Sequence, residues 1–285
     1  MGSCCSTSDN SSQHELDQQP RPAQPPPSDM PPTRDHVVTL DKKWAYHAVD
    51  GYELNNNTWG LESATSGSQR THYDGPPSSP PGGGGGGGGG GASESGGAVG
   101  IAWSTDWEWQ GGEHNVKSYV YGARRFERRL LSEIRALPTE AEWHYSTWDV
   151  RANVAYDIFT DTDRDHANSS GEFEVMIWLA KLGGVWPISE SKAPIAHVDI
   201  CGHQWEVHFG HNHGGAMKVY SFLPVNGPIQ HFSADVKQFF DYLSHQFQFP
   251  QHNQYMLVFQ LGTEAFTGGP AEFVVPKFIA DVVCE

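Results

Sequence analysis

The stretch Gly171-Glu172-Phe173-Glu174-Val175-Met176-Ile177-Trp178-Leu179 alternates between two kinds of side chain. One set is wholly apolar and comprises Phe173, Val175, Ile177 and Leu179; the other comprises Glu172, Glu174, Met176 and Trp178. Because successive side chains of a β-strand point to opposite faces, this period of two predicts a strand with one face in the core. The other face combines carboxyl, thioether and indole groups, which suit a groove that holds a sugar ring beside an acid.

A second segment, Tyr255 to Leu261, shows the same alternation and places Tyr255, Leu257, Phe259 and Leu261 inward. If the alternation continues, Gln260 and Glu264 share the opposite face, on the side expected for Glu174. The run Phe266-Thr267-Gly268-Gly269 is typical of a turn, so we expect Glu264 at the end of its strand. Two carboxyl groups from distant parts of the chain, one ionised and one protonated, are what the hydrolysis of a glycosidic bond requires.

Two further motifs accompany these strands: Tyr156-Asp157-Ile158-Phe159-Thr160 and Asn56-Asn57-Thr58-Trp59-Gly60. Together with Glu174-Val-Met-Ile-Trp and Gly262-Thr-Glu-Ala-Phe-Thr-Gly, they resemble glycoside hydrolase family 12, whose members are endo-β-1,4-glucanases and xyloglucanases. The similarity runs from Val37 to Val283. It implies an all-β jelly-roll sandwich of two antiparallel sheets, in which the concave sheet forms the substrate cleft. It also implies retaining, endo-acting hydrolysis of β-1,4-glucosidic bonds in cellulose-like glucan, mixed-linkage glucan or xyloglucan.

The resemblance assigns roles to three carboxyl groups. Glu174 aligns with the family's nucleophile, and Glu264 aligns with the general acid that later acts as a base. Glu172 shares the predicted face of Glu174 but does not immediately precede the Val-Met-Ile-Trp string. Asp157 lies in a strand-like run with its side chain toward the groove, and the resemblance implies that it hydrogen-bonds the nucleophile and orients it.

Aromatic and amide side chains supply the candidate sugar-binding positions. Asn57 and Trp59 match family positions on the non-reducing side of the cleaved bond, where Trp59 offers a stacking surface. Met176 and Trp178 are expected to form the floor of the cleft, and Gln260 shares their face. A separate segment, Ile101 to Gln110, carries three tryptophans on one face, and core packing and sugar binding are equally supported for them. They are Trp103, Trp107 and Trp109, of which Trp103 is retained as a substrate-binding candidate.

Composition excludes several other classes of protein. The 285 residues suffice for one large β-domain plus tails, and 12% of them are aromatic, which favours strands. A formal net charge of -16 argues against nucleic acid as a partner, and no apolar run is long enough to span a membrane. The four cysteines have no zinc or disulfide spacing. The histidine-rich run from His203 to His213 matches no metal pattern and predicts a surface hairpin, so we expect no metal and no cofactor. We also expect a monomer.

Residues 1–36 are polar and rich in Pro, Ser and Gln, which predicts a disordered tail before a hydrolase domain over 37–285. An insert at about 75–97 contains Gly82 to Gly91 and is expected to be a flexible loop. The family implies an extracellular enzyme, whereas the tail has no apolar signal segment. Its first residues, Met1-Gly2-Ser3-Cys4-Cys5-Ser6, fit an acylation motif at Gly2, which we interpret as a chance match or as an incorrectly assembled start.

One helix is predicted near the C-terminal part. Phe232, Val236, Phe239, Phe240 and Leu243 repeat at helical spacing, with Ser233 as the expected cap and Asp235 in the first turn. Such a helix should pack across the back of a sheet.

Two alternatives to a β-glucanase remain open. A binding protein on the same scaffold could hold glucan without cleaving it, although such a protein has no need of a paired nucleophile and acid. An endo-xylanase is the nearest enzymatic alternative, because a related sandwich uses a similar pair of carboxyl groups.

Overall fold

The computed structural model describes residues 36–78 and 99–285, so most of the predicted tail and the run Gly82 to Gly91 lie outside the described residues. The chain is mostly β, with one α-helix, α1 (Lys237–Phe247), among the described residues. The strands of the first half are β1 (Val38–Leu40), β2 (Tyr46–Val49), β3 (Tyr52–Asn55), β4 (Ser66–Gly75), β5 (Ile101–Gln110), β6 (Ser118–Arg124), β7 (Ile134–Ala136) and β8 (Pro138–Tyr145). Those of the second half are β9 (Val150–Asp161), β10 (Phe173–Leu182), β11 (Ala196–Ile200), β12 (His203–Asn212), β13 (Met217–Pro224), β14 (His231–Asp235), β15 (Tyr255–Met256), β16 (Gln260–Ala280) and β17 (Val283–Cys284).

Four 3₁₀-helices complete the described elements: η1 (Leu61–Ser63), η2 (Leu131–Glu133), η3 (His213–Gly215) and η4 (Gln251–Asn253).

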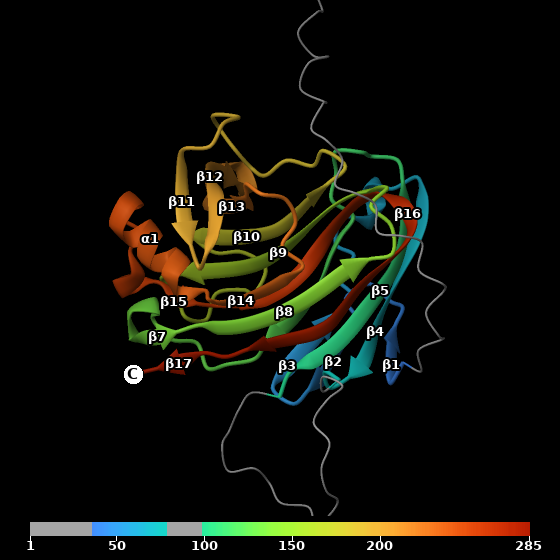
Figure 1. The fold of residues 1–285 in the computed structure, drawn as a ribbon, viewed down its shortest axis with the longest axis horizontal. Coiled ribbons are helices and arrows are strands. Elements are labelled where there is room, and N and C mark those ends of the chain that lie inside the picture. Colours follow the sequence, from blue (N-terminus) through green and yellow to red (C-terminus); the bar gives the residue numbers. More distant parts are fainter. Residues whose placement is uncertain (1–35, 79–98) are drawn as a thin grey trace, which may run out of the picture. The chain divides into compact units, whose positions relative to one another are not determined.

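The strands form a sandwich whose two layers share β16 (Figure 1). Sheet A follows the pairing order β1-β4-β5-β16-β8-β14, and sheet B follows β2-β3-β6-β16-β9-β10-β13-β12-β11. The first part of β16, from Gln260, pairs with β6 and β9, and its later part, up to Ala280, pairs with β5 and β8. The predicted sandwich is confirmed. One strand pair among the described residues, β10 with β13, is parallel, which differs from the predicted wholly antiparallel arrangement.

The main core lies between the two layers and contains the predicted inward face of β10. Phe173, Val175, Ile177 and Leu179 all belong to it. Met176 and Trp178, on the other face of β10, belong to a separate apolar cluster with Ala155, Val185, Leu223 and Phe266. Alternate residues of β10 therefore pack into two apolar clusters on the two sides of sheet B.

The second predicted strand is interrupted, and part of its inward face is wrong. Tyr255 and Met256 form the short strand β15, and it is Met256, not Tyr255 or Leu257, that enters the main core. Phe259 and Leu261 lie in the core as predicted. The reason for the change of phase is the irregular segment between β15 and β16, which shifts the alternation by one residue.

The turn predicted after Glu264 is also wrong. β16 continues through this segment to Ala280, and its pairing register shifts near the glycines. Gly268 and Gly269 have φ values of 118° and 90°, a backbone region that favours glycine. At this bend β16 changes from pairing mainly within sheet B to pairing within sheet A.

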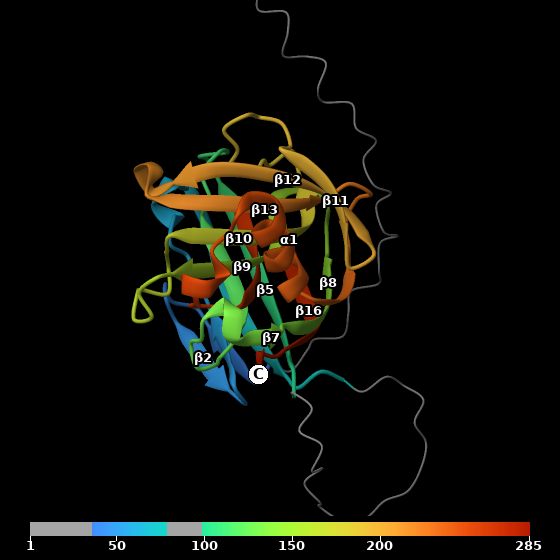
Figure 2. The same ribbon diagram turned by 90° about the vertical axis from the view of Figure 1, so that its left-hand side faces the viewer.

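The helix exists but begins later than the sequence predicts. Phe232 and Ser233 belong to strand β14, which pairs with β8, so Ser233 does not cap the helix. Asp235 instead accepts the backbone N–H groups of Leu137 and Lys237 on its Oδ1, at 2.7 and 3.0 Å. α1 packs against the back of sheet B, where the Phe239 ring lies 5.3 Å from that of Trp205 in β12 and 4.9 Å from that of Phe222 in β13. Figure 2 shows α1 beside these strands.

Trp103 is a core residue, which corrects its assignment to the substrate site. It is fully buried, and its ring lies 5.5 Å from that of Phe273. Trp107 and Trp109 face the same main core. β5 belongs to sheet A and turns this face toward sheet B, so the three tryptophans fill the interior of the sandwich.

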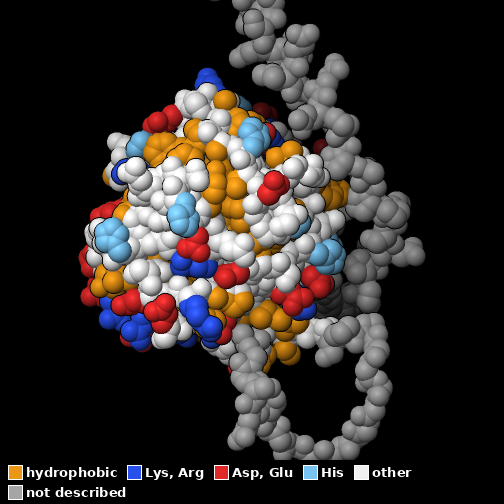
Figure 3. Space-filling model, turned by 60° about the vertical axis from the view of Figure 1, so that its left-hand side comes forward, with side chains coloured by type: hydrophobic (Ala, Val, Ile, Leu, Met, Phe, Trp, Pro, Cys, Tyr) orange, Lys and Arg blue, Asp and Glu red, His pale blue; other side chains and the backbone are white. Residues whose placement is uncertain are grey.

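No helix among the described residues is long and apolar enough to cross a membrane. On the face shown in Figure 3, the Lys and Arg side chains lie among Asp and Glu and form no continuous basic surface within the described part.

Candidate active site

A row of side chains, all polar except Met176, crosses five strands of sheet B on the face away from the main core. Strand pairing places each of them opposite the next, in the order Gln260 on β16, Asp157 on β9, Met176 on β10, Ser221 on β13 and His208 on β12. We call this the central row. Glu174 is two residues from Met176 along β10, and Glu264 is four residues from Gln260 along β16, so both project from the same face as the row.

Asn153 holds Glu264 at two points, its carboxyl group and its backbone N–H. Its side-chain Nδ2 donates to Glu264 Oε2, and its Oδ1 accepts the backbone N–H of Glu264 at 2.9 Å. On the core side, Thr263 Oγ1 donates to the backbone carbonyl of Asn153 at 2.5 Å and contacts Tyr145 Oη at 2.7 Å. Asn153 was not predicted as a site residue, although the period of two from Asp157 places it on the groove side of β9.

Burial changes the acidity of all three carboxyl groups. It raises the pKa of Glu174 to about 8, with a further increase from the charge of Glu264 and an opposing effect from a hydrogen bond of Asn212. Burial raises the pKa of Glu264 to about 7, against the stabilising effect of the Asn153 hydrogen bond on the ionised form. The pKa of Asp157 lies well above its usual range because of burial and then the charges of Glu174 and Glu264.

The three carboxyl groups therefore lie close enough to influence one another, and they carry fewer than three negative charges near neutral pH. Asp157 is 6% exposed and Glu174 is 7% exposed, so solvent relieves little of this repulsion. The raised pKa values do not by themselves decide which glutamate is the nucleophile. They indicate a site that keeps at least one of its carboxyl groups protonated near neutral pH.

The hydrogen bond expected between Asp157 and Glu174 stays a prediction, since it requires a proton on one of the two carboxyl groups. Asp157 Oδ1 and Glu174 Oε2 are both buried, and neither has a hydrogen-bond partner among the described residues. The charge of Glu174 raises the pKa of Asp157, which favours a proton on Asp157. Buried oxygens without partners on an open face of a sheet are positions where substrate hydroxyl groups can donate.

The raised pKa of Glu174 has a consequence for stability. Between its ordinary value of 4.5 and about 8, the folded chain binds more protons than the unfolded chain, so this group lowers the free energy of unfolding as the pH rises. Glu174→Gln removes the ionisable group, and we expect it to raise the Tm over wild type at pH 8 by at least about 2 °C, with a smaller difference at pH 4. Calorimetry at both pH values tests this; a difference that does not change with pH would contradict it.

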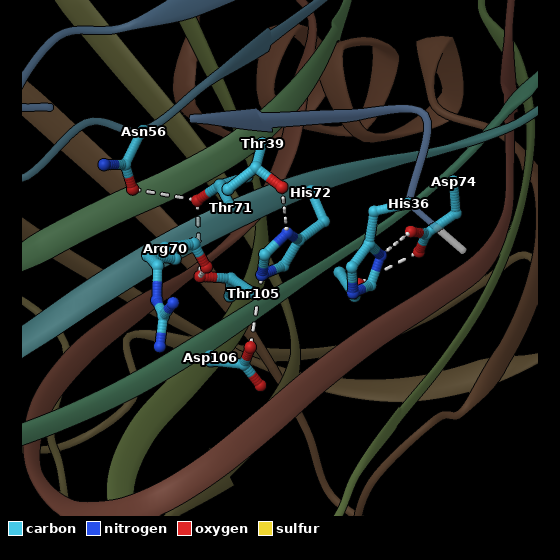
Figure 4. Close-up of polar contacts among 10 residues, drawn as sticks. His36, Thr39, Asn56, Arg70, Thr71, His72, Asp74, Thr105 and Asp106 are labelled. Atoms are coloured by element: carbon cyan, nitrogen blue, oxygen red, sulfur yellow. Dashed lines mark hydrogen bonds and ion pairs between the residues drawn. The ribbon is translucent and has the colours of Figure 1, made fainter. Parts of the chain in front are cut away.

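The segment Asn56–Gly60 lies at one end of this face. The backbone carbonyl of Asn57 accepts the N–H of Tyr119 at 2.9 Å, and Tyr119 pairs with Glu264 across β6 and β16. Next to it, buried Asn56 accepts a hydrogen bond from Gln69 on the inner side of β4, at 2.8 Å. It accepts another from Thr71, also at 2.8 Å (Figure 4). This anchoring fixes the segment that carries Trp59, which is 47% exposed, against the start of β6.

Trp44 is a second exposed aromatic at this end, and it was not predicted. It is 53% exposed, and its backbone N–H donates to the carbonyl of Asn56 at 3.2 Å. Lys43 Nζ lies 5.4 Å from its ring and also donates to the carbonyl of Trp59 at 3.4 Å. Exposed tryptophans fixed in this way are typical of sugar-stacking surfaces. The signal in the sequence was only a lone Trp before a short strand.

The remaining predicted sugar-binding residues form the base of the face. Met176, Trp178 and Gln260 are 5%, 2% and 4% exposed, so each presents only a small surface. Trp178 packs with Val185 and Phe266 rather than presenting an open ring. Asn57 Oδ1 is buried and has no hydrogen-bond partner among the described residues, which leaves it available to a hydroxyl group.

The histidines of β12 do not gather at one point. The alternation of the strand places His208 on the groove face and His203 and His211 on the other. No group of three or more His, Cys, Asp or Glu side chains in the described part of the chain has an arrangement that could hold a metal ion.

A sandwich that buries a cluster of three carboxyl groups on one face, beside exposed tryptophans, defines the class of β-sheet hydrolases that act on polysaccharides. The chain matches the family model of Glycosyl hydrolase family 12 over residues 92–283. It is 39% identical to Endoglucanase A of Aspergillus kawachii over 81% of this chain and 87% of that protein. It is 38% identical to the xyloglucan-specific endo-beta-1,4-glucanase A of Emericella nidulans over 84% of this chain and 89% of that protein. The chain therefore belongs to glycosyl hydrolase family 12.

Solved structures agree with this assignment. The catalytic domain of Humicola grisea Cel12A, in complex with a soaked thio cellotetraose, has a TM-score of 0.75 and 43% sequence identity, covering 86% of this chain and 99% of that one. Endoglucanase 3 of Trichoderma harzianum, also from this family, has a TM-score of 0.73 and 34% identity, covering 86% and 97% of the two chains. The family predicted from four sequence motifs is thereby confirmed.

Proposed function

We propose that the protein is an endo-acting hydrolase of β-1,4-glucosidic bonds that retains the anomeric configuration, with cellulose-like glucan, mixed-linkage glucan or xyloglucan as its substrate. Glu174 attacks the anomeric carbon, and Glu264 protonates the departing oxygen. Glu264 then removes a proton from the water that hydrolyses the glycosyl-enzyme. Asp157 tunes the charge of Glu174. Trp59 and Asn57 bind sugar units on the non-reducing side. An extracellular location and a monomeric state belong to this proposal, since the family resemblance implies the former.

One observation supports this proposal above the others: the carboxyl groups of Glu174, Glu264 and Asp157 lie on one face of sheet B, where the charges of Glu174 and Glu264 raise the pKa of Asp157 and the charge of Glu264 raises that of Glu174. A binding protein gains nothing from burying three mutually repelling carboxyl groups, because each costs solvation energy. A hydrolase needs both a carboxylate and a proton at neutral pH, and this cluster holds both.

The release of reducing ends from a panel of polysaccharides tests the proposal. We expect activity on at least one of xyloglucan, barley-type β-glucan and carboxymethylcellulose, and little on xylan. Binding of these glucans without cleavage would instead support the binding-protein alternative. Cleavage of xylan alone would overturn the substrate class.

A further inference from the structure

We propose that Trp186 is a stacking platform for a sugar unit on the leaving-group side of the cleaved bond. This inference rests on the proposed function and adds to it a residue that determines where the departing chain binds. Trp186 lies in the segment between β10 and β11 and is 48% exposed, which matches the 47% of Trp59. The two half-exposed tryptophans lie toward opposite ends of the central row.

The order of strands places the carboxyl groups between these tryptophans. The segment of Trp59 is anchored on β6, Glu264 lies on β16, and Glu174 lies on β10. The contacts of Trp186 are further along the sheet, with His208 on β12 and Lys181 at the far end of β10. Since Trp59 is assigned to the non-reducing side, a chain lying across the strands reaches Trp186 with its leaving-group side.

Two side chains fix the indole ring while leaving part of it open. Lys181 Nζ lies 4.4 Å from the ring centroid, and the ring of His208 lies 5.3 Å away at an interplanar angle of 79°. A cation over one face of an indole and a near-perpendicular second ring are both favourable contacts. Because these contacts restrict the ring while 48% of the residue stays exposed, stacking on a sugar costs little additional side-chain entropy.

The backbone around Trp186 is also held against the groove face. Gly210 on β12 has no side chain there, and a Cβ at this position would lie 2.8 Å from Ile188 Cγ2 and 3.1 Å from the backbone N of Ser189. This close approach lets the segment cross the strand. Glu190 then donates its N–H to the carbonyl of Phe209 at 3.0 Å. The platform is therefore part of the folded sheet rather than a free loop.

Buried polar atoms next to the platform point to a hydroxyl-bearing ligand. His208 and Ser221 are fully buried, and neither His208 nitrogen nor Ser221 Oγ has a hydrogen-bond partner among the described residues. His208 Nε2 has only a longer ion-pair contact, at 3.5 Å, with Glu206 Oε2. The two residues face each other across β12 and β13, in the same row as Met176 and Asp157. Burying polar atoms without a hydrogen-bond partner costs folding free energy. A sugar stacked on Trp186 brings hydroxyl groups that can be this partner.

The test compares a substrate with sugar units on both sides of the cleaved bond and a substrate with none on the leaving-group side. A cello-oligosaccharide such as cellohexaose extends across both sides of the cleaved bond, whereas β-cellotriosyl fluoride places only a fluoride ion on the leaving-group side. We expect Trp186→Ala to lower kcat/KM about 5- to 10-fold for cellohexaose and to leave it unchanged for the fluoride. Trp186→Phe should retain most of the activity on cellohexaose. Trp59→Ala should lower kcat/KM for both substrates.

Val225→Ala is the matched control, because Val225 is 46% exposed and lies beyond β13, away from the central row. It should change neither rate. Equal losses on both substrates for Trp186→Ala, or no loss on cellohexaose, would overturn the role of Trp186 while leaving the proposed function intact. A wild-type protein that hydrolyses neither substrate and none of xyloglucan, barley-type β-glucan and carboxymethylcellulose would overturn the proposed function itself. A wild-type protein that hydrolyses one of these glucans but not cellohexaose would overturn this inference alone.

Discussion

Glu174→Gln is expected to lower kcat on the preferred glucan by on the order of 10⁴-fold or more, because an amide cannot form the glycosyl-enzyme. The side chain keeps its size, and the buried site loses a charge that it solvates poorly, so the variant should fold and bind substrate. The release of reducing ends gives the rate, and calorimetric titration with a cello-oligosaccharide gives the affinity. Retained affinity with lost turnover separates a chemical role from a structural one.

Glu172→Gln is the control for this variant. Glu172 precedes Glu174 by two residues, but Thr162 Oγ1 and Gln254 Nε2 donate to its carboxyl oxygens at 2.5 and 2.8 Å, outside the carboxyl cluster. This variant should turn over glucan at close to the wild-type rate. If Glu172→Gln abolished turnover while Glu174→Gln did not, the assignment of the nucleophile would be wrong.

Glu264→Gln should lower kcat/KM on glucan by about 10²- to 10⁴-fold, because the departing oxygen then receives no proton. Fluoride needs little protonation to leave, so β-cellotriosyl fluoride should lose far less with this variant. Glu174→Gln should lose activity on both substrates. A Glu264→Gln variant that lost activity equally on both would have a structural or nucleophilic role instead. With the pKa of Glu264 at about 7 and that of Glu174 at about 8, wild-type kcat/KM on glucan should be highest between these two pH values and fall on either side.

The period of two in a single segment was sufficient to predict the core face of β10, and the family resemblance predicted the sandwich. What the sequence could not show is where a strand changes partner. The glycines after Glu264 are typical of a turn, yet here they let β16 bend from one layer into the other. Helical spacing from Phe232 onward placed the start of the helix too early for a similar reason. Pairing of this segment with β8 outweighs its local preference for a helix.

Residue types alone also left the environment of individual side chains undecided. Trp103 and Trp59 are chemically identical, yet one is buried between the layers and the other is 47% exposed. Only the assignment of β5 to sheet A decides between the two interpretations. Asn153 was overlooked because its function depends on the register that brings β9 beside β16, which no local pattern encodes.

The course of β16 couples the general acid to the whole molecule. The backbone of Glu264 belongs to a strand whose further residues pair with β5 and β8 in the opposite layer. Neither layer can therefore separate without disturbing the register that positions this acid. Heat inactivation and the loss of tertiary structure should consequently follow a single curve, with no temperature range in which an inactive but otherwise intact enzyme accumulates.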